Sequence, residues 1–277
     1  MRFAAWRQSG KGYKSGYKSI IGYIDKYFGE NKMEKTIKIG TMLSEIPFAN
    51  MPLLFKNAGL DFFIVDNEHG GFDYRELSQI IMTSALCGMK VIVRLSDNSR
   101  KDVTKMADMG VNGFLLPMTN DASDIGEVVK YAKYAPSGKR GISTTRAHTF
   151  YNPPKLSDYM ASANERMEIY AQIETKSGVE NVEKILSLDG VSGAFVGPND
   201  LSCDYGCIGS SDPEEIFGAI EKVAIASKNT GKPCGIITAN KKYIDFAKNR
   251  GFSLFSVGSE LNMIMNAGRK IVSDFNS

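Results

Sequence analysis

Short apolar runs alternate with amphipathic stretches eight times between residues 36 and 277. The runs are long enough for buried strands and too short for helices, and such strands form a parallel sheet covered by helices. Eight units in about 240 residues match the size of one TIM barrel, ~250 residues. The predicted fold class is therefore α/β, a single TIM (β/α)8 barrel over residues 36–277, with a doubly wound sheet as its rival.

The first four strand–helix units are regular. In the second unit, Leu77, Ile80 and Ile81 recur at helical spacing, as expected for a helix with one buried face. The segment GTMLS at 40–44 is not a nucleotide-binding glycine loop, which disfavours the doubly wound sheet. The expected strands are 36–42, 61–65, 90–94 and 113–116, and the expected helices are 52–58, 74–87, 100–109 and 122–134.

A stretch rich in glycine, proline and polar residues, 135–166, interrupts this alternation and is expected to be a long loop. The alternation then resumes as four further units that complete the predicted barrel. Their expected strands are 168–173, 193–196, 233–237 and 254–257, and their expected helices are 179–188, 213–229, 241–250 and 260–275.

Residues 1–35 form a basic N-terminal extension, with eight basic and three acidic residues, whereas the rest of the chain has 26 and 28. Tyr13, Tyr17, Ile20 and Ile24 recur at helical spacing and predict a short amphipathic helix. Packing of this helix on the body of its own or a neighbouring subunit is favoured over membrane binding. The nearly neutral body argues against a nucleic-acid partner. No apolar run approaches the ~20 residues that span a bilayer, so no membrane partner is expected.

The four cysteines, Cys87, Cys203, Cys207 and Cys234, are few and scattered, which suits a reducing cytoplasm. No histidine accompanies them, so free or buried thiols are favoured over a zinc site. A cytoplasmic location is therefore expected.

Candidate site residues follow the predicted strands, because a barrel of this kind places its reactive groups at the carboxyl ends of the strands. Glu174 and Asp200 come from adjacent strands, and two carboxylates without cysteines suit Mg²⁺ or Mn²⁺ completed by water and substrate. Either acid alone would more often be a solvated surface group. The strand ends carry Asp66, Glu68 and His69, then Arg94, then Gln172 and Glu174, and finally Gly197, Pro198 and Asp200.

Two roles are open for Arg94. Its planar guanidinium group can bind a substrate carboxylate, and it can equally form a salt bridge to the acids after the second strand. His69 suits proton transfer near neutral pH, although a lone histidine after a strand is more often a structural hydrogen-bonder. The other histidine, His148, follows Arg146 in the long loop and is interpreted as a loop residue. Whether His148 or Arg146 contacts the far end of the substrate is left open.

Other catalytic chemistries find little support in the sequence. Lys176 is the one lysine near a predicted strand end, but it lies outside the strand and is expected to point to solvent, which disfavours a Schiff base. The pattern Gly-x-Ser-x-Gly of serine hydrolases is absent.

From about residue 37 to residue 272, the sequence resembles the HpcH/HpaI aldolase family. The matching segments, in the family's order and spacing, are VDNEH at 65–69, VIVR at 91–94, GFLLPM at 113–118, KRG at 139–141, QIE at 172–174 and GPNDLS at 197–202. Members are metal-dependent, class II pyruvate aldolases, such as 4-hydroxy-2-oxoheptanedioate aldolase and 2-dehydro-3-deoxyglucarate aldolase. The resemblance implies a lyase that cleaves or forms a 4-hydroxy-2-oxo acid, giving pyruvate and an aldehyde through a metal-stabilised enolate. It also implies a homohexamer whose subunits exchange their last helix.

The resemblance implies a role for each site residue. Glu174 and Asp200 match the ligands of the divalent metal, Mg²⁺ or Mn²⁺, with Co²⁺ as a further candidate. Arg94 matches the residue that holds and polarises pyruvate. His69 matches the base that works through a water, helped by an aspartate that corresponds to Asp108 on the helix after the third strand. The implied substrate site comprises Asp66, Glu68, Arg94, Gln172, Gly197 and Pro198.

Two departures concern the acceptor aldehyde. Leu95 stands where many members have proline, and Asn67 stands where many have a small or apolar residue, so both could alter the shape of the pocket. Two other functions are weighed against the aldolase. A citrate-lyase-like CoA thioester lyase would want a basic surface near the barrel mouth, and a catalytically idle barrel would act only as a binding module.

Overall fold

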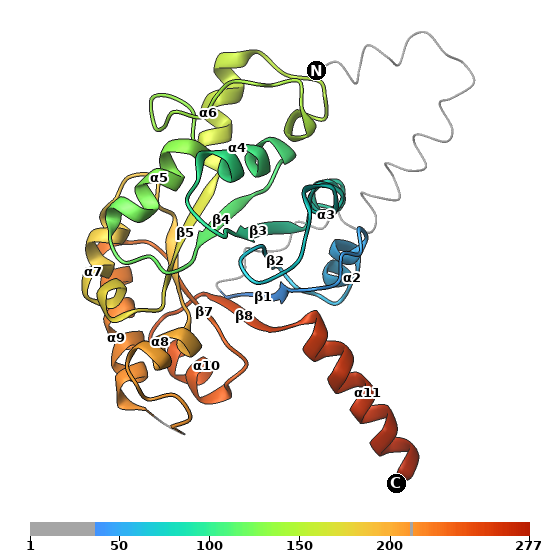
Figure 1. The fold of residues 1–277 in the computed structure, drawn as a ribbon, viewed down its shortest axis with the longest axis vertical. Coiled ribbons are helices and arrows are strands. Elements are labelled where there is room, and N and C mark those ends of the chain that lie inside the picture. Colours follow the sequence, from blue (N-terminus) through green and yellow to red (C-terminus); the bar gives the residue numbers. More distant parts are fainter. Residues whose placement is uncertain (1–36, 211–212) are drawn as a thin grey trace. The chain divides into compact units, whose positions relative to one another are not determined.

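A closed barrel of eight parallel strands forms the body of the protein in a computed structural model that describes residues 37–210 and 213–277 (Figure 1). The strands follow one another around the barrel in sequence order, and β1 closes it by pairing with both β2 and β8. The strands are β1 (Lys38–Leu43), β2 (Phe62–Asp66), β3 (Lys90–Arg94), β4 (Gly113–Leu116), β5 (Glu168–Ile173), β6 (Gly193–Val196), β7 (Cys234–Ile237) and β8 (Leu254–Ser259). The predicted TIM barrel is confirmed. The amphipathic helix expected within residues 1–35 lies outside the described residues.

Helices follow the strands and return the chain to the start of the next strand. Asp73 illustrates how they begin, because its carboxylate accepts from the backbone N–H groups of Arg75 and Glu76 while Glu76 bonds back. Among the described residues, no helix has the length and apolar character to cross a bilayer. The helices are α2 (Met51–Asn57), α3 (Tyr74–Cys87), α4 (Arg100–Met109), α5 (Ala122–Ala132), α6 (Leu156–Arg166), α7 (Lys176–Ser187), α8 (Pro198–Asp204), α9 (Glu214–Thr230), α10 (Lys241–Lys248) and α11 (Glu260–Asn276), with a 3₁₀ turn η2 (Ala147–Thr149).

Large side chains fill the inside of the barrel, and glycines on the strands make room for them. A Cβ added to Gly40 would lie 2.6 Å from the ring of Phe62, and one added to Gly235 would lie 2.7 Å from the ring of Phe195. This packed interior holds the strands in register, so that their carboxyl ends meet at one rim. The interior cluster comprises Met42, Phe62, Ile64, Ile92, Leu115, Tyr170, Phe195 and Leu254.

The prediction of one long loop over 135–166 is wrong in part, because this stretch contains η2 and α6. Helix α6 buries only Tyr159 and Ala163, and Lys155 at its start offers no side-chain cap. A helix with so narrow an apolar face has little periodic signal in the sequence.

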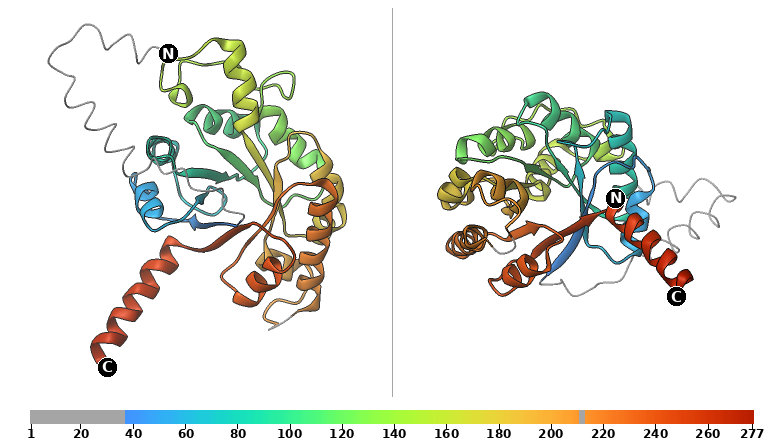
Figure 2. Two further views of the ribbon diagram at one scale, coloured as in Figure 1. Left: turned by 180° about the vertical axis from the view of Figure 1, so that it is seen from behind. Right: turned by 60° about the horizontal axis from the view of Figure 1, so that its bottom comes forward.

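Helix α11 extends away from the barrel (Figures 1 and 2). Glu260 is its one buried residue, although the helix has the amphipathic pattern that normally buries one face. Phe275, near the end of the helix, is 90% exposed. The barrel of a single chain therefore leaves an apolar helix face uncovered.

Candidate active site

The carboxyl ends of β2, β3, β5 and β6 bring most of the predicted site residues to one rim of the barrel. Asp66 and Arg94 are the last residues of β2 and β3 and face each other in the strand register. Gln172 lies in β5 and Glu174 directly follows it. Asp200 lies in the first turn of α8, the short helix that begins at Pro198 after β6.

Asp66 and Arg94 form a buried, two-pronged ion pair. Arg94 Nε lies 3.1 Å from Asp66 Oδ1 and Nη2 lies 2.7 Å from Oδ2, while Nη1 lies 3.1 Å from Glu68 Oε2. Burial opposes ionisation of Asp66, but the bonds from Arg94 and from the backbone of His69 and Glu68 hold its pKa below the ordinary value. Of the two roles predicted for Arg94, the salt bridge is confirmed. Contact with a substrate carboxylate stays a prediction.

Glu174 is a deeply buried acid of the rim, with 2% of its surface exposed. Its Oε1 accepts a 2.6 Å bond from the Met118 N–H, and its Oε2 accepts a bond from the Gln172 side-chain amide. Burial, with smaller effects from the nearby Asp200 and Glu68 charges, raises the pKa of Glu174 to about 7. A carboxylate in this state gains from a cation beside it.

Gly197 is required by the close approach of β6 to Glu174. A Cβ at this position would lie 2.6 Å from Glu174 Oε2 and 3.2 Å from the Gln172 amide nitrogen. The other side-chain atom of Gln172, Oε1, is buried without a hydrogen-bond partner among the described residues. The floor of the rim therefore offers an open acceptor beside a buried carboxylate.

The charges at the rim fit a divalent cation. The negative charges of three acids lie close enough to repel one another: Glu68, Glu174 and Asp200. The positive charge near them is Arg94, which is already paired with Asp66. In the described part of the chain, no three His, Cys, Asp or Glu side chains are close enough to hold a metal by themselves. Glu174 and Asp200 would thus supply two oxygen ligands and leave the other positions to water and substrate, as hard cations accept.

His69 stands at the edge of this site, with 72% of its side chain exposed and Nε2 3.8 Å from Glu68 Oε2. The chain turns sharply after it. A Cβ added to Gly70 would lie 2.2 Å from the Asp66 carbonyl oxygen and 2.6 Å from that of Ser44. The imidazole is therefore open to incoming molecules, while its backbone is held by the loop around it.

Asp108 is not brought to His69 within one chain. It lies near the end of α4, which runs back from the rim to the amino ends of the strands. Arg140 Nη2 donates a 2.7 Å bond to Asp108 Oδ1, and His148 Nε2 lies 3.8 Å from the same oxygen. His148 is thus part of a buried cluster at the opposite end of the barrel, while Arg146 is exposed in the same loop.

Of three further residues named from the sequence, two are placed away from the reacting centre and one stays beside it. Lys176 begins α7, and its ammonium lies over the Tyr205 ring, 5.3 Å from the centroid. Leu95 is fully buried in the apolar layer between strands and helices, so it can alter the pocket only through packing behind Arg94, and that effect stays a prediction. Asn67 is half-buried and its N–H donates to the Arg94 carbonyl oxygen, which keeps it beside the site. All four cysteines are free, as expected.

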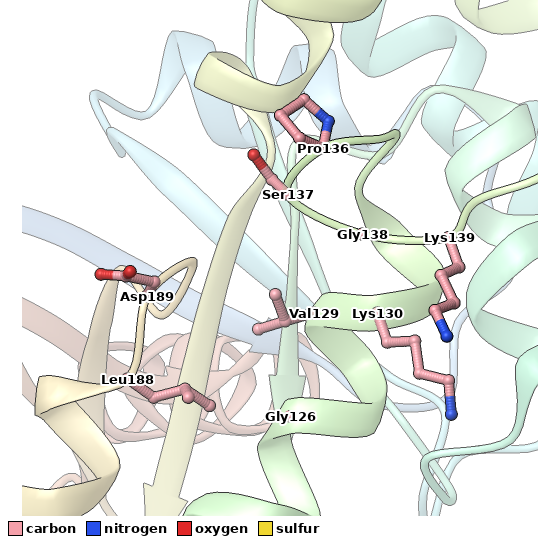
Figure 3. Close-up of a pocket in the computed structure, with 9 residues that line it drawn as sticks. All are labelled: Gly126, Val129, Lys130, Pro136, Ser137, Gly138, Lys139, Leu188 and Asp189. Carbon is pink, nitrogen blue, oxygen red and sulfur yellow. The ribbon is translucent and has the colours of Figure 1, made fainter.

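A separate cavity of about 320 Å³ lies on the outside of the barrel, between α5 and the turns at 136–139 and 188–189. Figure 3 shows Lys130 and Lys139 pointing to one side of it, with Asp189 on the other. None of the strand-end residues lines this cavity. It is therefore distinct from the candidate active site.

The profile of the HpcH/HpaI aldolase/citrate lyase family matches residues 49–267. The chain belongs to this family. It is 32% identical over 223 residues to the 5-keto-4-deoxy-D-glucarate aldolase of Klebsiella pneumoniae subsp. pneumoniae, with 79% of this chain and 84% of that protein covered. It is 30% identical to the 4-hydroxy-2-oxo-heptane-1,7-dioate aldolase of Escherichia coli, with 80% and 84% covered. The crystal structure of an HpcH/HpaI aldolase from Desulfitobacterium hafniense has a TM-score of 0.82 at 30% identity and covers 87% of this chain and 93% of that chain.

Membership of the HpcH/HpaI family decides between the functions weighed from the sequence. The family is metal-dependent, and the chain is an enzyme of the aldehyde-lyase class. The citrate-lyase-like alternative is not favoured, because the curated relatives described above are aldolases. The idle barrel is not favoured for the same reason.

Two contributors to this HpcH/HpaI site escape sequence reasoning. Met118 takes part through its backbone N–H to Glu174, and its φ of 48° is a left-handed conformation that side-chain-bearing residues seldom adopt. Glu260, the first residue of α11, reaches back to the loop after β1. A backbone donor leaves no trace in residue identity, and Glu260 reads as an ordinary acid in a first helical turn.

Proposed function

We propose that this enzyme cleaves, and in reverse forms, the C3–C4 bond of a 4-hydroxy-2-oxo acid, giving pyruvate and an aldehyde. The observation that supports it most directly is the rim itself. There, a fixed guanidinium faces two carboxylates that can share a divalent cation, and an open histidine stands beside them. A 2-oxo acid presents adjacent carboxylate and keto oxygens, which suit a cation and an arginine together.

Glu174 and Asp200 are the proposed ligands of Mg²⁺ or Mn²⁺, with Co²⁺ as a further candidate. When bound, such a cation supplies Lewis-acid polarisation of the 2-oxo group. Arg94 is held by Asp66 so that its fork cannot rotate away, and it stabilises the negative charge that develops on the substrate. Gln172 and the backbone at Gly197 and Pro198 form the floor under pyruvate, with Glu68 at the side.

His69 is the proposed proton-transfer group, acting through a water. In cleavage, the proton of the 4-hydroxyl group is removed, the C3–C4 bond breaks, the aldehyde leaves and the enolate of pyruvate takes a proton at C3. Because Asp108 lies at the opposite end of its own barrel, it can assist His69 only from a neighbouring subunit.

A homo-oligomer is proposed on the evidence of α11. Its apolar residues, led by Ile264, Ile271 and Phe275, are exposed along most of the helix. A second copy of the chain is the proposed occupant, exchanging its own last helix in return, and a homohexamer is the expected assembly. Phe275→Asp should lower the mass measured by light scattering. If light scattering gave the wild-type protein the mass of a single subunit, the exchange would be contradicted.

Proton exchange at pyruvate tests the proposed activity without knowledge of the aldehyde. Purified enzyme with Mn²⁺ or Mg²⁺ should replace the methyl protons of pyruvate by deuterium in D₂O, observed by NMR. EDTA should abolish the exchange, and borohydride should not trap pyruvate on the protein. Absence of exchange with every divalent metal would refute the proposal, and trapping would indicate a lysine mechanism. A panel of aldehydes offered with pyruvate would then identify the acceptor.

A further inference from the structure

Glu260 is a buried carboxylate bound by three consecutive backbone N–H groups. Its Oε1 accepts from Ser44 at 2.9 Å, from Glu45 at 2.7 Å and from Ile46 at 3.2 Å, and its Oε2 also lies 2.9 Å from the Ser44 nitrogen. The side chain is 2% exposed. A carboxylate bonded to several N–H groups at once fixes their loop, because each would otherwise be left without a partner.

The loop held by Glu260 directly follows β1 and therefore lies at the rim. Its Ser44 carbonyl oxygen packs against Gly70, where an added Cβ would be only 2.6 Å away. Gly70 adjoins His69, and the His69 N–H is in turn tied to Asp66 Oδ1 at 3.1 Å. A continuous set of short contacts thus runs from the start of α11 to the histidine loop.

The end of β8 sets the position of Glu260, the residue that follows it. Gly258, in the last residues of β8, has a φ of 63°, a left-handed conformation that suits glycine, and the pairing of β8 with β1 shifts register here. Thr41, fully buried in β1, donates to the carbonyl oxygens of Val257 and Gly258 at 3.1 Å each. The two strand ends are therefore locked together before Glu260 reaches across.

We propose that Glu260 is a positioning residue, which sets the histidine loop 66–71 through the turn 44–46. It touches neither substrate nor metal ligand, and acts by holding the Ser44 carbonyl against Gly70. The first residue of the last helix thereby controls the placement of the proposed base. The inference rests on the proposed function only for its effect on catalysis, because the coupling of the two loops is a property of the protein alone.

Amide hydrogen–deuterium exchange on Glu260→Gln tests the coupling directly. The variant keeps the size of the side chain but turns one acceptor oxygen into a donor facing N–H groups. The amides of 44–46 and of 66–71 should both exchange faster, with protection elsewhere in the barrel unchanged. Glu45→Gln is the matched control, because it removes an exposed carboxylate of the same turn and should leave both segments as in the wild type.

Catalysis supplies the second readout. Proton exchange at pyruvate should slow about tenfold to hundredfold in Glu260→Gln, as expected when a reacting group is misplaced by a fraction of an ångström. Mn²⁺ affinity should be unchanged, and the pH profile of the rate should shift, which a general loss of stability would not cause. Should Glu260→Gln fail to fold, the shorter Glu260→Asp is measured in the same way.

The outcomes separate this inference from the proposed function. Faster amide exchange confined to 44–46, with 66–71 unchanged, overturns the coupling whatever the activity. Faster amide exchange in both segments supports the coupling. If the wild type at the same time fails to exchange the methyl protons of pyruvate, the coupling stands and the aldolase proposal is refuted.

Discussion

The two ends of the barrel each contain an aspartate–arginine pair with a buried arginine, and the surroundings of the two pairs differ. At the carboxyl rim, Arg94 and Asp66 are bordered by the further carboxylates of Glu68 and Glu174. At the amino end, Arg140 pairs with Asp108 at 2.7 Å, and its guanidinium stacks over the Tyr134 ring, 4.6 Å from the centroid. Two pairs of the same residue types therefore have different roles, because the groups that surround them differ.

Aromatic rings pack around the amino-end cluster, whereas Arg94 at the rim is surrounded by the carboxylates of Glu68, Glu174 and Asp200. Tyr134 and Tyr159 pack edge to face with centroids 6.1 Å apart, and His148 Nδ1 bonds the Tyr159 hydroxyl. Excess negative charge at the rim is instead available to a cation and a substrate. Within one subunit, the pair packed against rings stabilises the fold, while the pair beside unbalanced charge can act on a ligand; any catalytic part of Asp108 is played in a neighbouring subunit.

The largest expected difference comes from replacing each arginine by lysine, which keeps the charge and removes the planar fork. Arg94→Lys should slow proton exchange at pyruvate about hundredfold to thousandfold, the loss typical of a donor aimed at developing charge. NMR in D₂O measures the rate. The variant's free energy of unfolding should also fall, by about 1–3 kcal/mol, because an ammonium cannot replace both buried bonds to Asp66.

Arg140→Lys is the matched counterpart at the amino end. It should lower the free energy of unfolding by about 1–3 kcal/mol, because buried hydrogen bonds to Asp108 and the ring contact are lost. Proton exchange should fall less than tenfold. A reversed result, with activity lost at Arg140 and kept at Arg94, would show that the two ends have been assigned the wrong way round.

A smaller effect is expected in the pH dependence of stability, through Glu174. Its pKa in the folded protein is raised to about 7 from an ordinary 4.5, so the folded state holds a proton that the unfolded state has released. Metal-free protein should therefore lose about 3 kcal/mol of stability as pH rises from below 4.5 to above 7.

Denaturant unfolding in EDTA between pH 4.5 and pH 8 measures this slope. Mn²⁺ should restore stability at pH 8 and do little at pH 5, because a carboxylate ligand must be ionised to bind metal. Glu174→Gln should remove both the slope and the response to Mn²⁺. An unaltered slope in that variant would place its origin in another group.

The smallest expected effect is at the amino end, through His148. Burial, aided by the nearby Arg140 and Arg146 charges, lowers its pKa below the ordinary 6.5, so the folded protein keeps it neutral. The unfolded chain binds a proton more readily, and stability should fall as pH drops below about 6.5. His148→Gln should flatten this part of the unfolding profile. If the slope persists, the histidine does not titrate as its burial requires.

Much of the barrel could be read from the sequence because its strands are buried on both faces. Runs such as Phe62–Asp66 and Glu168–Ile173 are apolar over most of their length, a pattern that only parallel strands under helices require. Helix α6 was missed because two buried side chains leave no periodic pattern. The order of strands and the rule that carboxyl ends face one rim were enough to gather Arg94, Glu174 and Asp200.

The relations between those residues depend on contacts between distant parts of the chain. That Arg94 is locked by Asp66, or that Glu260 holds the turn after β1 across more than 200 positions in the sequence, follows from barrel closure. Sequence spacing carries no information on such contacts.

The sequence by itself determined which chemical groups this protein has and at which strand ends they stand, because local periodicity places strands and the barrel orients them all alike. Only the tertiary structure decided which acids are paired and which are not, and that Asp108 lies at the opposite end of the barrel from His69. It also decided that the described residues 37–210 and 213–277 leave the apolar face of α11 exposed. Charge, burial and partnership arise when residues far apart in sequence meet, and for that reason they appear only in the folded molecule.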